Sequence, residues 1–183
     1  WSQEAKLLSS DGVWYDHFGH SVSIYGNTAL IGAYSDDNNT GAAYIFIRSG
    51  TKWIEYAKLN ASDKSPKDYF GLSVSLYGNT SLVGAFGDDD KGNESGSAYI
   101  FTQSGGIWTE QAKLTPSDGS MGDGFGMSTS LYGNISIIGS VGNDDNGDAS
   151  GSAYIFKFSN SSWVEQKKLI PSDGKSIDLF KAH

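Results

Sequence analysis

A repeat of just over fifty residues constrains the fold of this chain more than any other feature. Equivalent segments begin at four tryptophans: Trp1, Trp53, Trp108 and Trp163. The repeat lengths are therefore 52, 55 and 55 residues. Each segment leads to a phenylalanine, at Phe18, Phe70, Phe125 and Phe180, and the first three are followed by glycine, whereas Lys181 follows the last. Self-similarity at this period predicts a solenoid, a propeller or another repeat array.

Each repeat contains four strand signals. The first is an alternating run at 21–25, 73–77 and 128–132, and a Gly-Asn pair follows each run. Glycine adopts the positive φ that the first position of a type II′ hairpin needs, so this pair predicts a tight turn. The second strand ends in Gly-Ala or Gly-Ser, the third contains Ala-Tyr-Ile-Phe, and the fourth runs from the tryptophan to Lys-Leu. Four antiparallel strands at this period predict a propeller blade.

Residue size supports the propeller. Small residues recur on the inner strands, as at Ser21, Ser23 and Gly32, while bulky Tyr44 and Trp53 lie on outer strands. The blades of a propeller crowd together near the axis and diverge outward, so small residues fit the inner strands and bulky residues fit the outer strands. A sandwich or a solenoid of hairpins is the alternative architecture.

The order Phe-Gly, Gly-Ala, Asp-rich loop and Gly-x-Ala-Tyr-Ile-Phe resembles the FG-GAP repeat, whose family includes the propeller of integrin α subunits. The resemblance implies an all-β fold of consecutive four-stranded antiparallel blades and an extracellular or cell-surface location. Three full blades are expected, with signals at 18–59, 70–114 and 125–169, and residues 1–17 and 170–183 are assigned to flanking strands of neighbouring blades.

Three blades do not close a ring, because propellers have about four to eight. We therefore expect an arc of a larger propeller or array, from a processed or partial chain that begins at Trp1. Two copies could also complete a six-bladed ring, or blades could join end to end in a filament.

Composition excludes several partners. Thirteen Lys and Arg against 21 Asp and Glu give a net charge of -8, with no basic cluster, so nucleic acid is a poor partner. No apolar stretch is long enough for a membrane span, and no signal peptide is recognisable. Without cysteine there is no disulfide or thiolate metal site.

Six glycosylation sequons occur, at Asn38, Asn60, Asn79, Asn93, Asn134 and Asn160. In a chain this rich in Asn, Ser and Thr they could also arise by chance.

Acidic loops after the second strands, at 34–41, 87–96 and 142–151, suggest calcium because its ligands are oxygens. Asp144, Asn146 and Asp148 have alternate spacing, but the matching positions of the second loop are Asp89, Lys91 and Asn93, and a lysine is not a calcium ligand. In the resembled family the calcium loop lies earlier in the repeat, where this chain has only the Gly-Asn turn. We therefore expect no cofactor, with calcium as a minor possibility. Capping of loop backbone by Asp and Asn is the favoured interpretation.

Two further aspartates recur in every repeat, in the Ser-Asp step and two residues before each phenylalanine: Asp11, Asp63, Asp118 and Asp173, and Asp16, Asp68, Asp123 and Asp178. Paired carboxylates catalyse glycoside hydrolysis, but a catalytic pair is needed only once, so a shared turn is the better interpretation.

The lysine of each Lys-Leu step, with a nearby Glu or Gln, is interpreted as the solvated face of the outer strand: Lys6, Lys58, Lys113 and Lys168. His17, His20 and Trp14 are expected to pack or lie at the surface.

Together these features predict a non-catalytic extracellular repeat scaffold for adhesion, surface display or fibre assembly. Protein, glycan or further copies of the chain are the expected partners. The alternatives are the scaffold portion of a larger carbohydrate-active enzyme and a calcium-dependent binding module. Antiparallel strand order further predicts that the acidic loops and the interblade linkers emerge on one face.

Overall fold

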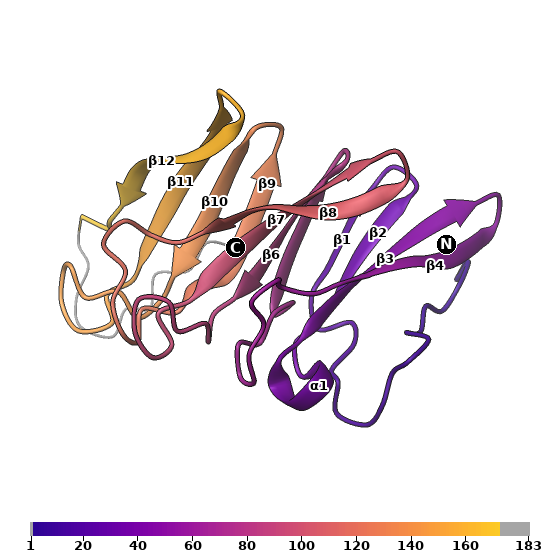
Figure 1. The fold of residues 1–183 in the computed structure, drawn as a ribbon, viewed down its shortest axis with the longest axis horizontal. Helices are drawn as coiled ribbons and strands as arrows, with labels where there is room; N and C mark the ends of the chain where they lie inside the picture. The colour runs from indigo at the N-terminus through magenta and orange to yellow at the C-terminus, as the bar shows by residue number, and fades with distance from the viewer. Residues whose placement is uncertain (1, 173–183) are drawn as a thin grey trace.

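Three four-stranded β-sheets stand side by side in the computed structural model, which describes residues 2–172 (Figure 1). Blade 1 contains β1 (Val22–Tyr25), β2 (Thr28–Ala33), β3 (Ala42–Ser49) and β4 (Lys52–Leu59). Blade 2 contains β5 (Ser73–Tyr77), β6 (Thr80–Ala85), β7 (Ser97–Ser104) and β8 (Ile107–Leu114). Blade 3 contains β9 (Phe125–Tyr132), β10 (Ile135–Ser140), β11 (Ser152–Ser159) and β12 (Ser162–Leu169). The single turn α1 (Asp36–Asn39) lies in the loop between β2 and β3.

Within each blade, every strand pairs antiparallel with the next one along the chain, as the repeat predicts. The Gly-Asn hairpins have the expected geometry, because Gly26, Gly78 and Gly133 have φ values of 59°, 59° and 60°. None of the three sheets closes on itself. The all-β, blade-like prediction is therefore confirmed.

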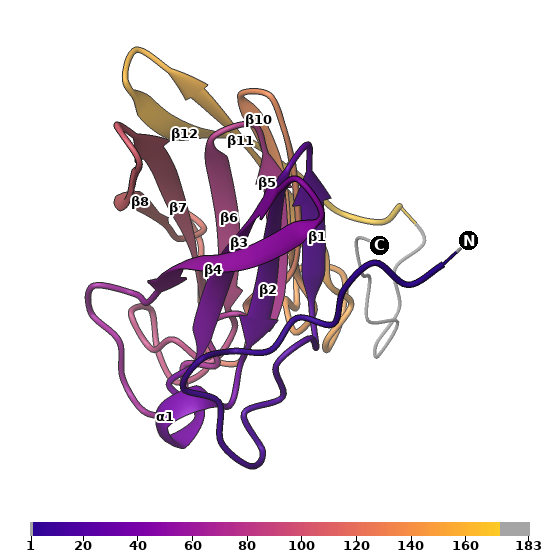
Figure 2. The ribbon, with the colours of Figure 1, turned by 90° about the vertical axis from the view of Figure 1, so that its right-hand side faces the viewer.

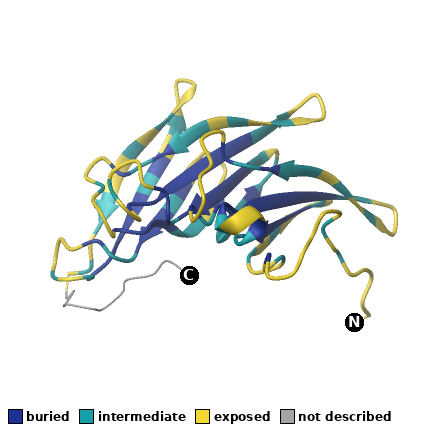
Figure 3. Ribbon diagram, turned by 60° about the horizontal axis from the view of Figure 1, so that its bottom comes forward, coloured by how far each residue is buried: buried dark blue, intermediate teal, exposed yellow. Residues whose placement is uncertain are grey.

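The core lies between the blades rather than inside any one of them. Leu30, Leu82 and Ile138 of the second strands are all fully buried, and Figure 3 shows the buried residues along the middle of each sheet. Ile137 is only half-buried because it faces away from the other two blades. A sheet with both faces covered in this way needs neighbours, so the blades stabilise one another.

Glycines permit the closest approach between blades. A Cβ on Gly32 would lie 1.9 Å from the carbonyl oxygen of Gly71, and Gly71 itself has a φ of 91°. The Ser21 hydroxyl donates to that same carbonyl at 2.8 Å. Phe70 completes the joint with a backbone hydrogen bond to Thr40 of the previous blade. The blade 2 to blade 3 joint repeats this arrangement.

The loops after β2, β6 and β10 and the interblade linkers gather at one end of the sheets, opposite the hairpin tips (Figures 1 and 2). This confirms the predicted asymmetry of the two faces.

The outer strand expected at the start of the chain is not formed in residues 2–8, because no third strand lies beside it to supply hydrogen bonds. The features expected at 173–183, including Asp173, Asp178, Phe180 and His183, lie outside the described residues. No helix in the described part of the chain is long and apolar enough to cross a membrane.

Candidate functional site

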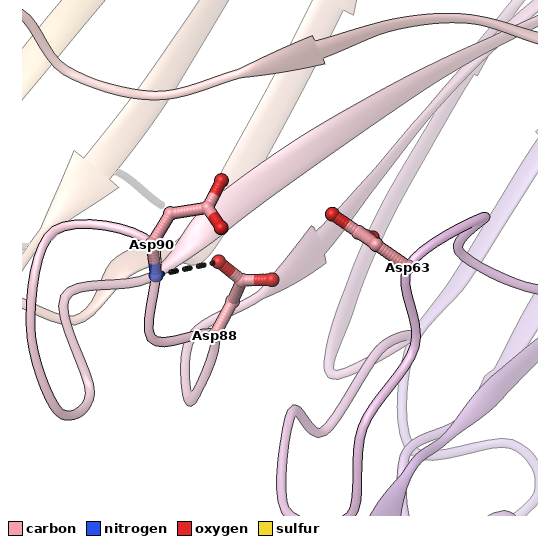
Figure 4. A group of neighbouring side chains, drawn as sticks. All are labelled: Asp63, Asp88 and Asp90. Atoms are coloured by element: carbon pink, nitrogen blue, oxygen red, sulfur yellow. Dashed lines mark hydrogen bonds between the residues drawn. The ribbon is translucent and has the colours of Figure 1, made fainter.

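A dense group of charges lies on the loop side of blade 2. Oxygens of Asp63, Asp88 and Asp90 lie within 4.8 Å of one another, and their side chains converge in Figure 4. The ammonium group of Lys113 sits among them, 2.7 Å from Asp63, 3.0 Å from Asp88 and 2.6 Å from Asp90. The chain therefore supplies its own cation to this cluster.

Four segments build the group. Asp63 comes from the linker after β4, Asp88 and Asp90 come from the loop after β6, and Lys113 comes from β8. Tyr99 of β7 places its hydroxyl 2.8 Å from Asp63 and 2.9 Å from Asp88. These contacts tie the incoming linker to the blade that follows it, and we call each such group a linker clamp.

Both other blades have a linker clamp. In blade 1 the Lys58 ammonium lies 2.7 Å from Asp11 and 2.9 Å from Asp36, and the Tyr44 hydroxyl contacts the same two carboxylates. In blade 3 the Lys168 ammonium lies 2.7 Å from Asp118 and 2.6 Å from Asp145, while the Tyr154 hydroxyl donates to Asp118.

The blade 3 clamp lacks one buried carboxylate. Asn143 stands where blades 1 and 2 have Asp36 and Asp88, and its side-chain nitrogen donates to the Tyr154 hydroxyl at 3.4 Å. The lysine therefore has two carboxylate partners in blade 1, of which one is buried, and three in blade 2. In blade 3 it has two carboxylate partners, and both are exposed. The lysine and the linker aspartate are present in all three clamps.

A serine and a glutamate reinforce each clamp. The backbone N–H and hydroxyl of Ser62 both donate to Glu110 at 2.9 Å. The same pair of bonds joins Ser10 to Glu55 and Ser117 to Glu165. The Ser-Asp step of each linker is thus held by the glutamate and the lysine of one outer strand.

The clamp shifts the protonation of its members. Burial alone would raise the pKa of Asp63, but hydrogen bonds from Lys113 and Tyr99 lower it below its usual value. Burial opposes the charge on Lys113, yet its carboxylate partners raise its pKa well above the usual range. Burial, followed by the charge of Asp88, raises the pKa of Tyr99. At neutral pH Asp63 and Lys113 are therefore charged and Tyr99 is neutral.

The expectation that these lysines form a solvated face is wrong for Lys58, Lys113 and Lys168, because each points into the acidic loops. Strand alternation cannot distinguish an outward lysine from one that reaches an acidic loop beyond the strand end. The sequence does contain a signal for these lysine contacts, because the Ser-Asp step and the Glu-x-x-Lys pattern recur together from repeat to repeat.

Three of the four residues proposed as calcium ligands form hydrogen bonds with backbone groups. Asp144 accepts from the Ala149 N–H at 2.8 Å, and Asp89 accepts from the Glu94 N–H at 2.9 Å. Asn146 donates to the Pro171 carbonyl at 2.7 Å, and Asp148 is exposed. Calcium binding at these positions remains a prediction. In the blade 2 clamp a divalent cation could use the same oxygens only if the Lys113 ammonium moved away.

The second set of repeated aspartates holds turns, as the sequence predicts. Asp16, Asp68 and Asp123 are buried and accept from backbone N–H groups three residues earlier, at 2.6, 2.6 and 2.8 Å. Asp68 also faces Asp63, Asp88 and Asp89. Burial, opposed in part by the Ser65 hydrogen bond and assisted by these charges, raises its pKa to about 6.

The remaining residues singled out in the sequence lie at the surface. His17 and His20 pack against Tyr34, with ring centroids 4.8 and 4.7 Å apart, and Trp14 is exposed. Five sequon asparagines are exposed, namely Asn38, Asn79, Asn93, Asn134 and Asn160. Asn60 is half-buried.

The family model for the FG-GAP repeat matches residues 1–46, 53–101 and 108–156. The chain therefore belongs to the FG-GAP repeat family, and its sheets are propeller-like blades. No match was found among curated proteins. Among solved structures, the computationally designed Ika4 protein is similar in fold, with a TM-score of 0.53 over 93% of this chain and 80% of that one. Sequence identity with that protein is 12%.

Proposed function

We propose that this chain is a non-catalytic, extracellular repeat scaffold that serves adhesion, surface display or fibre assembly through its loops and blade edges. The observation that carries the proposal is the threefold recurrence of the linker clamp. The linker aspartates, which resemble members of acid-base pairs in the sequence, are bound by a lysine and a tyrosine of the same chain. A group held this way in every repeat contributes to stability rather than to one reaction centre.

An extracellular location is supported by the family and by the sequons. Exposed asparagines lie on both ends of the blades: Asn38 and Asn93 in the acidic loops, and Asn79, Asn134 and Asn160 in the opposite hairpins. Glycans at these positions would leave the blade edges and faces for contact with partners. Mass spectrometry of the chain secreted from a eukaryotic host measures their occupancy.

Two assays test the scaffold proposal. A printed glycan array and immobilised matrix proteins serve as binding probes, and a panel of nitrophenyl glycosides serves as substrates. We expect binding without turnover, and no difference in background hydrolysis between the wild type and Asp63→Asn. Hydrolysis that copurifies with the chain and disappears in Asp63→Asn would show that the repeated carboxylates are catalytic and would overturn the proposal.

A further inference from the structure

Three tyrosines at the same repeat position form a row of rings across the blades. Tyr25, Tyr77 and Tyr132 each end the first strand of a blade, directly before the Gly-Asn turn. The ring centroids of Tyr25 and Tyr77 lie 4.9 Å apart, and those of Tyr77 and Tyr132 are also 4.9 Å apart. We call these three residues the tyrosine row. It lies at the hairpin end of the sheets, opposite the linker clamps.

Hydrogen bonds between the first strands of neighbouring blades hold the tyrosine row in register. The Ser23 hydroxyl accepts from the Leu76 N–H at 3.0 Å, and the Ser75 hydroxyl accepts from the Leu131 N–H at 2.9 Å. Each bond crosses a joint between blades, within two residues of the tyrosines on either side. The strands that carry neighbouring rings therefore cannot slide past each other without breaking a hydrogen bond.

The rings of the tyrosine row are open to solvent and meet near their hydroxyl groups. Tyr25 and Tyr132 are 45% and 75% exposed, and Tyr77 between them is half-buried. The rings are inclined to each other at 50° and 61°, so they do not form a parallel stack. The nearby hydroxyl of Tyr132, followed by that of Tyr25, raises the pKa of Tyr77. The hydroxyl-bearing edges of neighbouring rings are therefore close together.

The other tyrosines are less suited to react with one another. Tyr34 and Tyr69 are 6.2 Å apart, and each is half-buried and packs against a further aromatic ring. The Tyr56 hydroxyl donates to the Gly106 carbonyl, and Tyr15 lies on the exposed linker that precedes blade 1. Three further tyrosines are buried, with their hydroxyls held in the linker clamps: Tyr44, Tyr99 and Tyr154.

We propose that the tyrosine row is a site of oxidative cross-linking, where Tyr77 is joined to Tyr25 or to Tyr132 by a carbon–carbon bond between their rings. The oxidant is a peroxidase acting with hydrogen peroxide. Each phenol gives up one electron and its hydroxyl proton, and the two radicals combine at ring carbons next to the hydroxyl-bearing ones. The hydrogen on each joined carbon then moves to the phenol oxygen. Hydrogen peroxide takes up the two electrons and two protons and becomes two molecules of water.

The arrangement of the row favours a bond within one chain. Holding two reactive groups side by side gives them a high effective concentration, so they react with each other before they meet a second chain. Exposed side chains change rotamer within nanoseconds, so the ring carbons can meet without movement of the strands. The bond closes a loop of more than fifty residues across a blade joint and restricts the unfolded chain as a disulfide does. This goes beyond the proposed scaffold function, because it describes a covalent bond between blades.

Treatment of the complete chain with a purified peroxidase and limiting hydrogen peroxide, at low protein concentration, tests the proposal. We expect a monomeric product that has lost two hydrogen atoms, shows dityrosine fluorescence and yields a peptide pair linking Tyr77 to Tyr25 or Tyr132. Its Tm should be about 10 °C above that of the untreated chain. Tyr77→Phe should fold as the wild type does and lose this product, since phenylalanine keeps the ring but has no hydroxyl to oxidise. The matched control Tyr56→Phe, 44% exposed in the wild type, should retain the product.

Other results would overturn the proposal. Absence of the monomeric cross-linked product, in a mixture that couples added N-acetyltyrosine, contradicts it. Dityrosine that forms only between chains, or that persists unchanged in Tyr77→Phe, would place the reactive residues elsewhere. A bond between Tyr34 and Tyr69 in place of one within the tyrosine row would do the same. None of these outcomes bears on the binding and glycoside assays, so the scaffold proposal stands or falls separately.

Discussion

Replacing Lys113 by alanine removes the ammonium group from three carboxylates, of which Asp88 is only 4% exposed. Breaking a buried ion pair by removing one partner costs about 3–5 kcal/mol, because the other charge stays buried without compensation. Asp63 and Asp90 are about half exposed, with side-chain exposures of 45% and 51%, so water screens part of their charge. We therefore expect a loss of about 2–4 kcal/mol in the free energy of unfolding.

Urea unfolding followed by tryptophan fluorescence measures this loss. The matched control is Lys64→Ala, because Lys64 and Asp37 form an exposed ion pair at 3.6 Å whose removal should change stability by about 0.5 kcal/mol or less. Adding Asp88→Asn to Lys113→Ala should restore part of the loss, since no buried charge remains. A loss below about 1 kcal/mol for Lys113→Ala would refute the view that the clamp holds the linker to the blade.

The cost of losing Lys113 should also depend on pH. The pKa of Asp63 is lowered in the folded protein, so its contribution is present above the usual value of 3.8 and is lost as pH falls through the folded pKa. The stability difference between the wild type and Lys113→Ala should therefore shrink between about pH 7 and pH 3.

Leu82→Ala should cost about 2–5 kcal/mol through lost burial and cavity formation, and a urea midpoint that does not move would contradict the packing of blade on blade. Gly71→Ala should lower Tm far more than Gly19→Ala, since both have a φ of 91° but only Gly71 meets a carbonyl; equal effects would mean that backbone strain alone matters. For Asp68, burial raises the folded pKa to about 6, so its contribution is present below 3.8 and is lost as pH rises through 6. Asp68→Asn should consequently stabilise the protein by about 1–3 kcal/mol at pH 7.5 and by much less at pH 4, and the reverse order would contradict this assignment.

Strand order, hairpin geometry and the common face of the acidic loops could be predicted from the sequence, because each depends on local patterning that repeats three times. The Gly-Asn turns need a positive φ at glycine, and small residues such as Gly32 are required where backbones meet. These constraints act within one repeat and its nearest neighbour. A single repeat therefore carries nearly all the information about the blade.

The linker clamp could not be predicted from strand periodicity. Lys113 lies at the end of β8, and its partners come from a linker fifty residues earlier and a loop more than twenty residues earlier. An alternating strand pattern specifies which side of the sheet a residue occupies, but it does not specify which distant loop crosses that strand end. Residues 2–8 form no strand in the structure for a related reason, since a strand sequence without a neighbouring strand has no hydrogen-bond partner.

A crystal structure of the chain grown with millimolar calcium would show which cation holds the three clamps. We predict that the ammonium groups of Lys58, Lys113 and Lys168 lie within hydrogen-bonding distance of Asp11, Asp63 and Asp118 respectively. Calcium ions between these carboxylates, with the lysines turned out to solvent, would contradict it and would make the blade assembly metal-dependent.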